Sequence, residues 1–118
     1  MEKLITWFEL PAADLDRSRN FYQSLFQVEM TPFENDMFVF PYDRPSATGG
    51  AIVKKGEPSA KGTIVYLGAN GKLDDMLGRV EKLGGKILLP KTLVNDQIGY
   101  IAEIKDTEGN RVGLHSVK

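Results

Sequence analysis

The fold is decided by a short strand that leads directly into a helix, ITWFELPAADLDRSRNFYQSLF, which spans residues 5–26. Residues 3–10 are rich in β-branched and aromatic side chains and predict a strand, which Pro11 ends because proline has no N–H for a strand ladder. Asp14 stands where a helix N-cap is expected. After it, apolar and small side chains recur at helical spacing and predict an amphipathic helix through Leu15, Ser18, Phe21, Tyr22, Leu25 and Phe26.

The same order of elements occurs twice along the chain. Three short strands are predicted after the first helix, over residues 28–33, 37–41 and 51–54. A strand over residues 63–67 and a second helix follow, and Gly84-Gly85 ends that helix because glycine tolerates a left-handed C-cap. The apolar stripe of this helix contains Leu73, Met76, Leu77, Val80 and Leu83. Three last strands are predicted over residues 86–89, 99–105 and 110–117.

The sequence therefore predicts an α+β fold with two βαβββ modules, at about residues 1–55 and 61–118. Residues 54–61 contain Gly56, Pro58 and Ser59, which suits a short linker. Each module alone is too small to bury both faces of its sheet, so the two are expected to pack together in one domain. A concave surface between them is where a binding site is expected.

Composition excludes several classes of function. The chain has 118 residues, no cysteine and one histidine, so zinc fingers, thiolate nucleophiles and sites with two imidazoles are excluded. The formal net charge is −1 and no basic run occurs, which argues against binding nucleic acid or an anionic membrane. No apolar stretch approaches the roughly 18 residues that span a bilayer, and the first residues lead into a strand pattern instead of a signal peptide. We expect a cytoplasmic protein with a small-molecule partner.

Two segments resemble the glyoxalase/bleomycin-resistance/extradiol dioxygenase family, the vicinal oxygen chelate superfamily. They are residues 5–22 and residues 99–114, where Asp106-Thr107-Glu108-Gly109 stands at a turn that usually reads Asp-Pro-Asp/Glu-Gly. The resemblance covers the whole chain. It implies a curved, incompletely closed cup of sheet with helices outside, and a divalent metal held by four side chains from the first and last strand of each module. It also implies a homodimer, since family members commonly pair.

The positions that match the family's metal ligands carry other residues here. The matching positions are Trp7 in the first strand, Thr63 in the fifth and Gly113 in the eighth, and residues 49–53 of the fourth strand offer no carboxylate or imidazole in any register. An indole ring and a glycine hydrogen cannot bind a divalent cation. We therefore expect no metal and no other cofactor, and an apolar pocket in place of the ion. A displaced metal site is the alternative, built from Glu9, Glu103 and His115.

Two titratable side chains are candidate catalytic residues. Strand alternation places Glu9 on the face of Trp7 and places His115 on the face of Gly113. Glu9 in an apolar cup would have a raised pKa and could act as a base, or it could be a rim carboxylate paired with Arg111 or a lysine. His115 could act as an acid, a base or a ligand anchor, or it could be a partly solvated residue without a role.

The predicted ligand-binding residues lie on these faces of the first and eighth strands and on the fifth and seventh strands. Trp7 fills space or serves as a platform for a planar ligand, and its indole N–H has Glu9, His115 or a water as candidate partners. Tyr100 and Glu103 alternate to opposite faces, and we favour Tyr100. The full predicted set is Trp7, Glu9, Thr63, Val65, Leu67, Tyr100, Gly113 and His115.

Three functions are compatible with these patterns. The first is a metal-independent protein that binds a small molecule in the cup. The second is a glyoxalase-like lyase or isomerase that uses Glu9 and His115 or a relocated divalent metal. The third is an interaction module whose sheets only build a dimer. The ligand itself depends on loops at residues 41–48 and 94–98, whose conformations the sequence pattern does not define.

Overall fold

The computed structural model describes residues 4–43 and 47–118. These residues form two helices and eight strands, in the order β1 (Trp7–Pro11), α1 (Leu15–Phe26), β2 (Thr31–Phe33), β3 (Met37–Val39), β4 (Gly49–Val53), β5 (Tyr66–Gly68), α2 (Leu73–Val80), β6 (Lys86–Asn95), β7 (Gly99–Lys105) and β8 (Arg111–Ser116). The start of the predicted first strand, Lys3, and part of the predicted loop at 41–48 lie outside the described residues. Neither described helix is long and apolar enough to cross a membrane.

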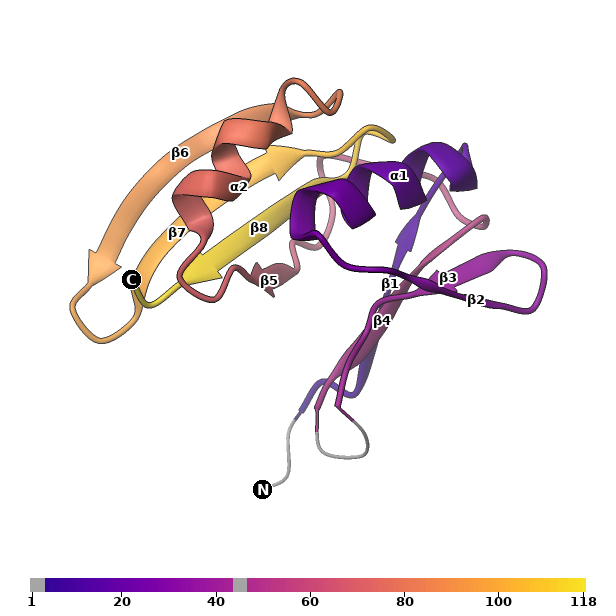
Figure 1. Cartoon of the computed structure of the whole chain (residues 1–118), viewed down its shortest axis with the longest axis horizontal. Helices are drawn as coiled ribbons and strands as arrows, with labels where there is room; N and C mark the ends of the chain where they lie inside the picture. The colour runs from indigo at the N-terminus through magenta and orange to yellow at the C-terminus, as the bar shows by residue number, and fades with distance from the viewer. Residues whose placement is uncertain (1–3, 44–46) are drawn as a thin grey trace.

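The strands form two four-stranded mixed sheets, ordered β1-β4-β3-β2 and β5-β8-β7-β6. In each sheet the first strand of the module runs parallel to the last one, and the other pairs are antiparallel. β1 and β4 extend through the lower part of Figure 1, whereas β6, β7 and β8 lie at its upper left, so the two sheets diverge and do not close into a barrel. The predicted α+β fold of two βαβββ modules is confirmed.

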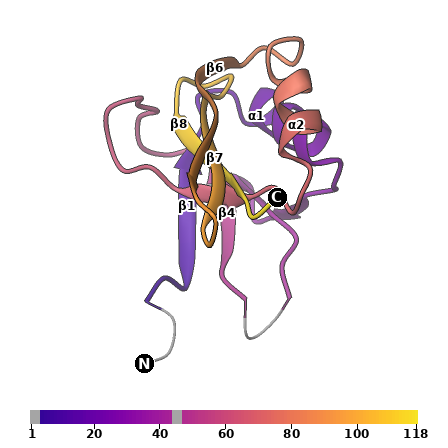
Figure 2. The same cartoon turned by 90° about the vertical axis from the view of Figure 1, so that its left-hand side faces the viewer.

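One apolar core is shared by both modules. Both helices lie on the same side of the sheets (Figures 1 and 2) and cover one face of each. Buried side chains from both helices and both sheets belong to one cluster, which includes Leu10, Phe21, Leu25, Ile52, Met76, Val80, Ile104 and Leu114. Burial of the apolar face of each helix stabilises this arrangement. The other face of each sheet is left open, and a binding site on the sheets has to lie there.

The ends of the helices follow the predicted signals. The side chain of Asp14 accepts a hydrogen bond from the backbone N–H of Arg17, so Asp14 is the N-cap of α1 as predicted. α2 ends at Val80, three residues before the last residue of its predicted apolar stripe. Gly84 then adopts a φ of +98°, which confirms its predicted role after the helix.

Of the strands in the described residues, only β7 has its predicted bounds, and Pro11 is the last residue of β1 instead of the residue that stops it. β5 begins at Tyr66, because Tyr66, Leu67 and Gly68 are the described residues that pair with β8, whereas Thr63 lies before the strand. β6 continues to Asn95, well beyond the predicted residues 86–89. It is an edge strand that pairs with β7 alone, and irregular register between Leu89 and Thr92 accommodates Pro90.

Candidate functional site

A groove of about 770 Å³ lies between the edge strands β1 and β5, where the two modules meet. It is lined by Ile5, Trp7 and Phe8, by Thr48 and by residues 63–68. A second hollow of about 330 Å³ shares Phe8, Thr63 and Val65 with the groove and adds the polar side chains of Glu9 and Arg111. The site is therefore an apolar groove with a polar end.

Two aromatic rings occupy equivalent places on the two sides of this groove. Trp7 of β1 stands opposite Gly49 of β4, and Tyr66 of β5 stands opposite Gly113 of β8. A Cβ atom at Gly49 would lie 2.8 Å from Cζ3 of Trp7, and a Cβ atom at Gly113 would overlap the ring of Tyr66. Each ring therefore rests on the bare backbone of the neighbouring strand, a place that only glycine leaves free.

The polar tip of each ring binds a carboxylate that is also paired with a cation. The indole Nε1 of Trp7 donates to Glu9 over 3.2 Å, and Lys55 Nζ lies 3.3 Å from the same carboxylate. In the other sheet the Tyr66 hydroxyl donates to Glu103 over 3.2 Å, and Arg111 Nε donates to Glu103 over 2.6 Å. Glu9 is thus the partner of the indole, and a lysine pairs with it.

The Tyr66 hydroxyl is held in its protonated form. Burial raises the pKa of Tyr66, and the Glu103 carboxylate beside it raises this pKa further, because a second negative charge would be unfavourable there. Tyr66 therefore serves as a hydrogen-bond donor to Glu103 at neutral pH and does not supply a base.

The structure brings together some of the predicted site residues. Trp7, Thr63, Val65 and Leu67 line the groove, and Glu9 lines the hollow that adjoins it. Gly113 lies beneath the Tyr66 ring, on the open face of the second sheet.

His115 and Tyr100 lie elsewhere. His115 shares the open face with Gly113, but it lines a separate hollow near the end of β8, where its Nε2 is 2.6 Å from the carbonyl oxygen of Ile98. Tyr100 packs against the core on the helix-covered face, with Lys91 Nζ 4.5 Å from its ring centroid. The structure thus places Glu103, and not Tyr100, on the open face of the second sheet.

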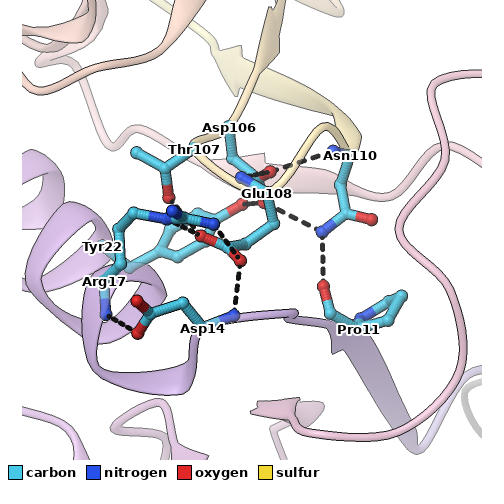
Figure 3. Close-up of polar contacts among 8 residues, drawn as sticks. All are labelled: Pro11, Asp14, Arg17, Tyr22, Asp106, Thr107, Glu108 and Asn110. Carbon is cyan, nitrogen blue, oxygen red and sulfur yellow. Dashed lines mark hydrogen bonds and ion pairs between the residues drawn. The ribbon is translucent and has the colours of Figure 1, made fainter.

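A polar cluster at the β7–β8 turn joins the second module to the first (Figure 3). Asp106 is 3% exposed and accepts hydrogen bonds from the Tyr22 hydroxyl, from the backbone N–H groups of Glu108 and Asn110, and from the Asn110 side-chain amide. The same amide donates to the carbonyl oxygen of Pro11, at the end of β1, over 2.7 Å. These contacts fix β1 relative to β8, and thereby the spacing between the two sides of the groove.

Glu108 extends this cluster to the start of α1. Its side chain is fully buried and accepts hydrogen bonds from the backbone N–H of Asp14, from Arg17 Nε and Nη2, and from the Thr107 hydroxyl. Burial alone would raise the pKa of Glu108, but these donors lower it to about 2. The sequence predicted the turn at residues 106–109, but no sequence spacing indicated that it binds the first module.

Comparison with known proteins supports the predicted resemblance. Residues 5–39 match the family described as bleomycin resistance protein-like, N-terminal. A glyoxalase/bleomycin resistance protein from Albidiferax ferrireducens T118 superposes with a TM-score of 0.76 at 16% identity, covering 97% of this chain and 98% of that one. No curated protein sequence matches the chain. This chain has the vicinal oxygen chelate fold.

Other proteins with this fold have diverse descriptions. A lactoylglutathione lyase from Agrobacterium tumefaciens has a TM-score of 0.65 at 19% identity, covering 97% of this chain and 93% of that one. A genomically encoded fosfomycin resistance protein, FosX, from Listeria monocytogenes has a TM-score of 0.69 at 17% identity, covering 98% and 94%. Structural similarity at this level of sequence identity establishes the vicinal oxygen chelate fold. The function has to be inferred from the residues of the site.

Strand pairing in this vicinal oxygen chelate fold shows which residues stand opposite two of the positions that the resemblance assigns to metal ligands, Trp7 and Gly113. Tyr66, and not Thr63, stands opposite Gly113, and Gly49 stands opposite Trp7. Tyr66 lies seven residues before the start of α2, whereas Trp7 lies eight residues before the start of α1. The prediction of Thr63 rests on its place directly after Gly62, the opening glycine of the second module, and that pattern does not indicate Tyr66.

The residues at these positions do not fit a divalent metal. Two of them are glycines, the third is an indole, and the fourth is a phenol whose hydroxyl already donates to Glu103. The displaced set of Glu9, Glu103 and His115 fits no better, because each side chain binds a different partner. Among residues 4–43 and 47–118, no three His, Cys, Asp or Glu side chains are grouped as metal ligands would be.

The packing of the Tyr66 ring against the backbone of Gly113 can be tested by substitution. Gly113→Ala is expected to lower the free energy of unfolding by about 1–3 kcal/mol, because the new methyl group displaces the ring. Gly78→Ala is the control: nothing lies within 4 Å of the added Cβ, and alanine in helix α2 should stabilise the protein by roughly 0.5–1 kcal/mol. Urea denaturation measures the free energy of unfolding of both variants. A Gly113→Ala variant as stable as the wild type would contradict the close packing of the Tyr66 ring against Gly113.

Proposed function

We propose that this protein binds a small molecule with an apolar body in the groove between β1 and β5, without a metal ion. The observation that carries the proposal is the pair of aromatic rings on the groove walls. Trp7 and Tyr66 remain 37% and 45% exposed although they are large apolar side chains. Covering such rings is a main source of ligand affinity in concave sites. A glyoxalase/bleomycin resistance protein and a fosfomycin resistance protein are among the proteins that share the fold.

Catalysis by Glu9 and His115 is less well supported. A general acid and a general base must both reach the same substrate, at hydrogen-bond distance or through one water. Glu9 lines the hollow beside the groove, and His115 lines a different hollow with Ser116 and Val117. We therefore favour a binding protein over a lyase or isomerase.

The groove contains its own reporter, since Trp7 is the only tryptophan in the sequence. We expect an uncharged bicyclic alcohol, either 2-naphthalenemethanol or its fully saturated counterpart, to change Trp7 fluorescence and to bind in calorimetry. Ile5→Arg places a charge on the groove wall and should weaken this binding at least tenfold.

Leu4→Arg is the matched control for this substitution. Leu4 is 83% exposed and Ile5 59% exposed, but only Ile5 lines the groove. The Leu4→Arg variant should bind as the wild type does. Failure of both alcohols to bind, or equal loss in both variants, would overturn the proposed function.

Metal independence has a separate test. We expect dialysis against a chelator to leave ligand affinity and melting temperature unchanged, because the strand positions that correspond to metal ligands carry Trp7, Gly49, Tyr66 and Gly113. Zinc, nickel, manganese and magnesium added in turn should not raise the melting temperature. A stoichiometric ion in elemental analysis, or a clear ion-dependent rise, would refute this part of the proposal.

We also propose that the chain forms a homodimer, as its resemblance implies. Four exposed apolar side chains near the β6–β7 turn and the end of β8 support this, namely Leu93, Val94, Ile98 and Val117. Light scattering at micromolar concentration should give twice the chain mass of 13.1 kDa. A mass of one chain would contradict the dimer.

A further inference from the structure

The aromatic rings of the groove are held as fixed, flat surfaces. Each ring lies against the backbone of a neighbouring strand, at Gly49 or Gly113, and the Trp7 ring also contacts the Tyr42 ring at a centroid distance of 5.9 Å, yet both Trp7 and Tyr66 remain partly exposed. The hydrogen bonds from Trp7 to Glu9 and from Tyr66 to Glu103 restrict rotation of both rings. Two preoriented rings on opposite walls favour a ligand that is itself flat, because stacking adds to the energy of burial and little side-chain entropy is lost.

The electrostatics of the groove favour a ligand without charge. All described residues that line the groove are uncharged, and they are Ile5, Trp7, Phe8, Thr48, Thr63, Ile64, Val65, Tyr66, Leu67 and Gly68. The two carboxylates at the ring tips are each paired already, Glu9 with Lys55 and Glu103 with Arg111. A charged ligand would lose its hydration without gaining a free partner on these walls.

One further charge lies near the polar end. Glu57 lines the adjoining hollow but is exposed, so water and salt screen it from the groove. It therefore gives the apolar groove no fixed counter-charge.

We infer that the ligand of this groove is an uncharged molecule with a flat aromatic ring system, which stacks against Trp7 and Tyr66. This inference rests on the proposed function, because it names the class of molecule that the groove takes. The donors of the indole and the phenol are already used by Glu9 and Glu103, so recognition depends on ring contact more than on hydrogen bonds to these tips.

Four probes with one bicyclic framework test the inference by calorimetry at neutral pH. They are 2-naphthalenemethanol, its saturated decahydro counterpart, 2-naphthoate and 2-naphthylmethylammonium. We expect the flat alcohol to bind about tenfold more tightly than the saturated alcohol, although the saturated one is the more hydrophobic, and at least tenfold more tightly than either ion. Equal binding of both alcohols would overturn the stacking inference while leaving the proposed function standing.

The remaining outcomes are equally distinct. If either ion binds more tightly than the flat alcohol, the inference that the ligand is uncharged is refuted. If neither alcohol binds, the proposed function itself is refuted. Trp7→Leu and Tyr66→Leu should each reduce the preference for the flat alcohol, whereas Tyr66→Phe, which keeps the ring, should retain it. Phe33→Leu is the control, because Phe33 is 55% exposed and is not among the groove residues. Loss of the preference in Phe33→Leu would contradict the assignment of the two rings.

Discussion

Asp106→Ala is expected to lower the free energy of unfolding by about 3–5 kcal/mol, the largest loss for any single polar substitution proposed for this chain. Both oxygens of the buried carboxylate are used, by the Tyr22 hydroxyl and by donors from Glu108 and Asn110. Alanine would leave the Tyr22 hydroxyl and the backbone N–H groups of Glu108 and Asn110 without this acceptor, at a position that is 3% exposed. Burial, together with Asp106, raises the pKa of Tyr22 well above its usual value, so the hydroxyl is always a donor here.

Urea denaturation followed by circular dichroism measures this loss. Tyr22→Phe removes one of the four hydrogen bonds and should cost about 1–2 kcal/mol. Asp74→Ala is the control, because Asp74 has a 77% exposed side chain and a surface ion pair with Lys91, so its removal should change stability by less than about 0.5 kcal/mol. A cost below about 1 kcal/mol for Asp106→Ala would show that the cluster does not hold the modules together.

The second large effect is a loss of stability at low pH, which Glu108 is expected to cause. The pKa of Glu108 is about 2 in the folded protein and 4.5 in its ordinary state. The lowered value means that the ionised carboxylate stabilises the fold above pH 4.5, and that this contribution is lost as the pH falls from 4.5 toward 2. A shift of this size corresponds to about 3–4 kcal/mol at most, and screening by solvent around the half-exposed Arg17 side chain reduces it to roughly 2 kcal/mol.

Comparison with Glu108→Gln isolates this contribution from other carboxylates. At neutral pH the variant should be less stable than the wild type by roughly 2 kcal/mol, and the difference should shrink as the pH is lowered to about 2.5. Melting temperatures measured across this range provide the test. Exposed Glu81→Gln should follow the wild-type curve at every pH. A constant gap between Glu108→Gln and the wild type would mean that the carboxylate charge is not responsible.

Lowering the pH should also affect ligand binding in the groove. From the β7–β8 turn, Glu108 binds the start of α1, and Asn110, whose side-chain amide also donates to Asp106, binds the end of β1 (Figure 3). Protonation of Glu108 weakens the contact that holds the two modules in register. Ligand affinity in the groove should therefore decline together with stability at low pH, even though no groove residue needs to titrate.

Local patterns in the sequence were sufficient for the elements and their faces. Asp14 caps α1 as predicted, since a side-chain acceptor at that position meets the free N–H of Arg17 through local geometry alone. Strand alternation placed Trp7 and Glu9 on one face of β1, opposite Phe8 and Leu10, because successive residues of a strand point to opposite sides. The doubled βαβββ order follows from the same short-range periodicities.

The pairing register of the strands and the distance between the modules could be learned only from the tertiary structure. Tyr66 lies opposite Gly113 only because β5 is short and begins three residues after Thr63, which no periodicity indicated. His115 shares a face with Gly113 as predicted, yet it faces a different hollow, since a common face does not fix which neighbouring strand a side chain meets. The sequence by itself determined which residues form strands and helices and which sides of them are apolar, because those properties depend on neighbours a few positions away. Only the packing of the two modules decided that Trp7 and Tyr66 line one groove, because β1 and β5 are brought together by contacts between segments up to 99 positions apart.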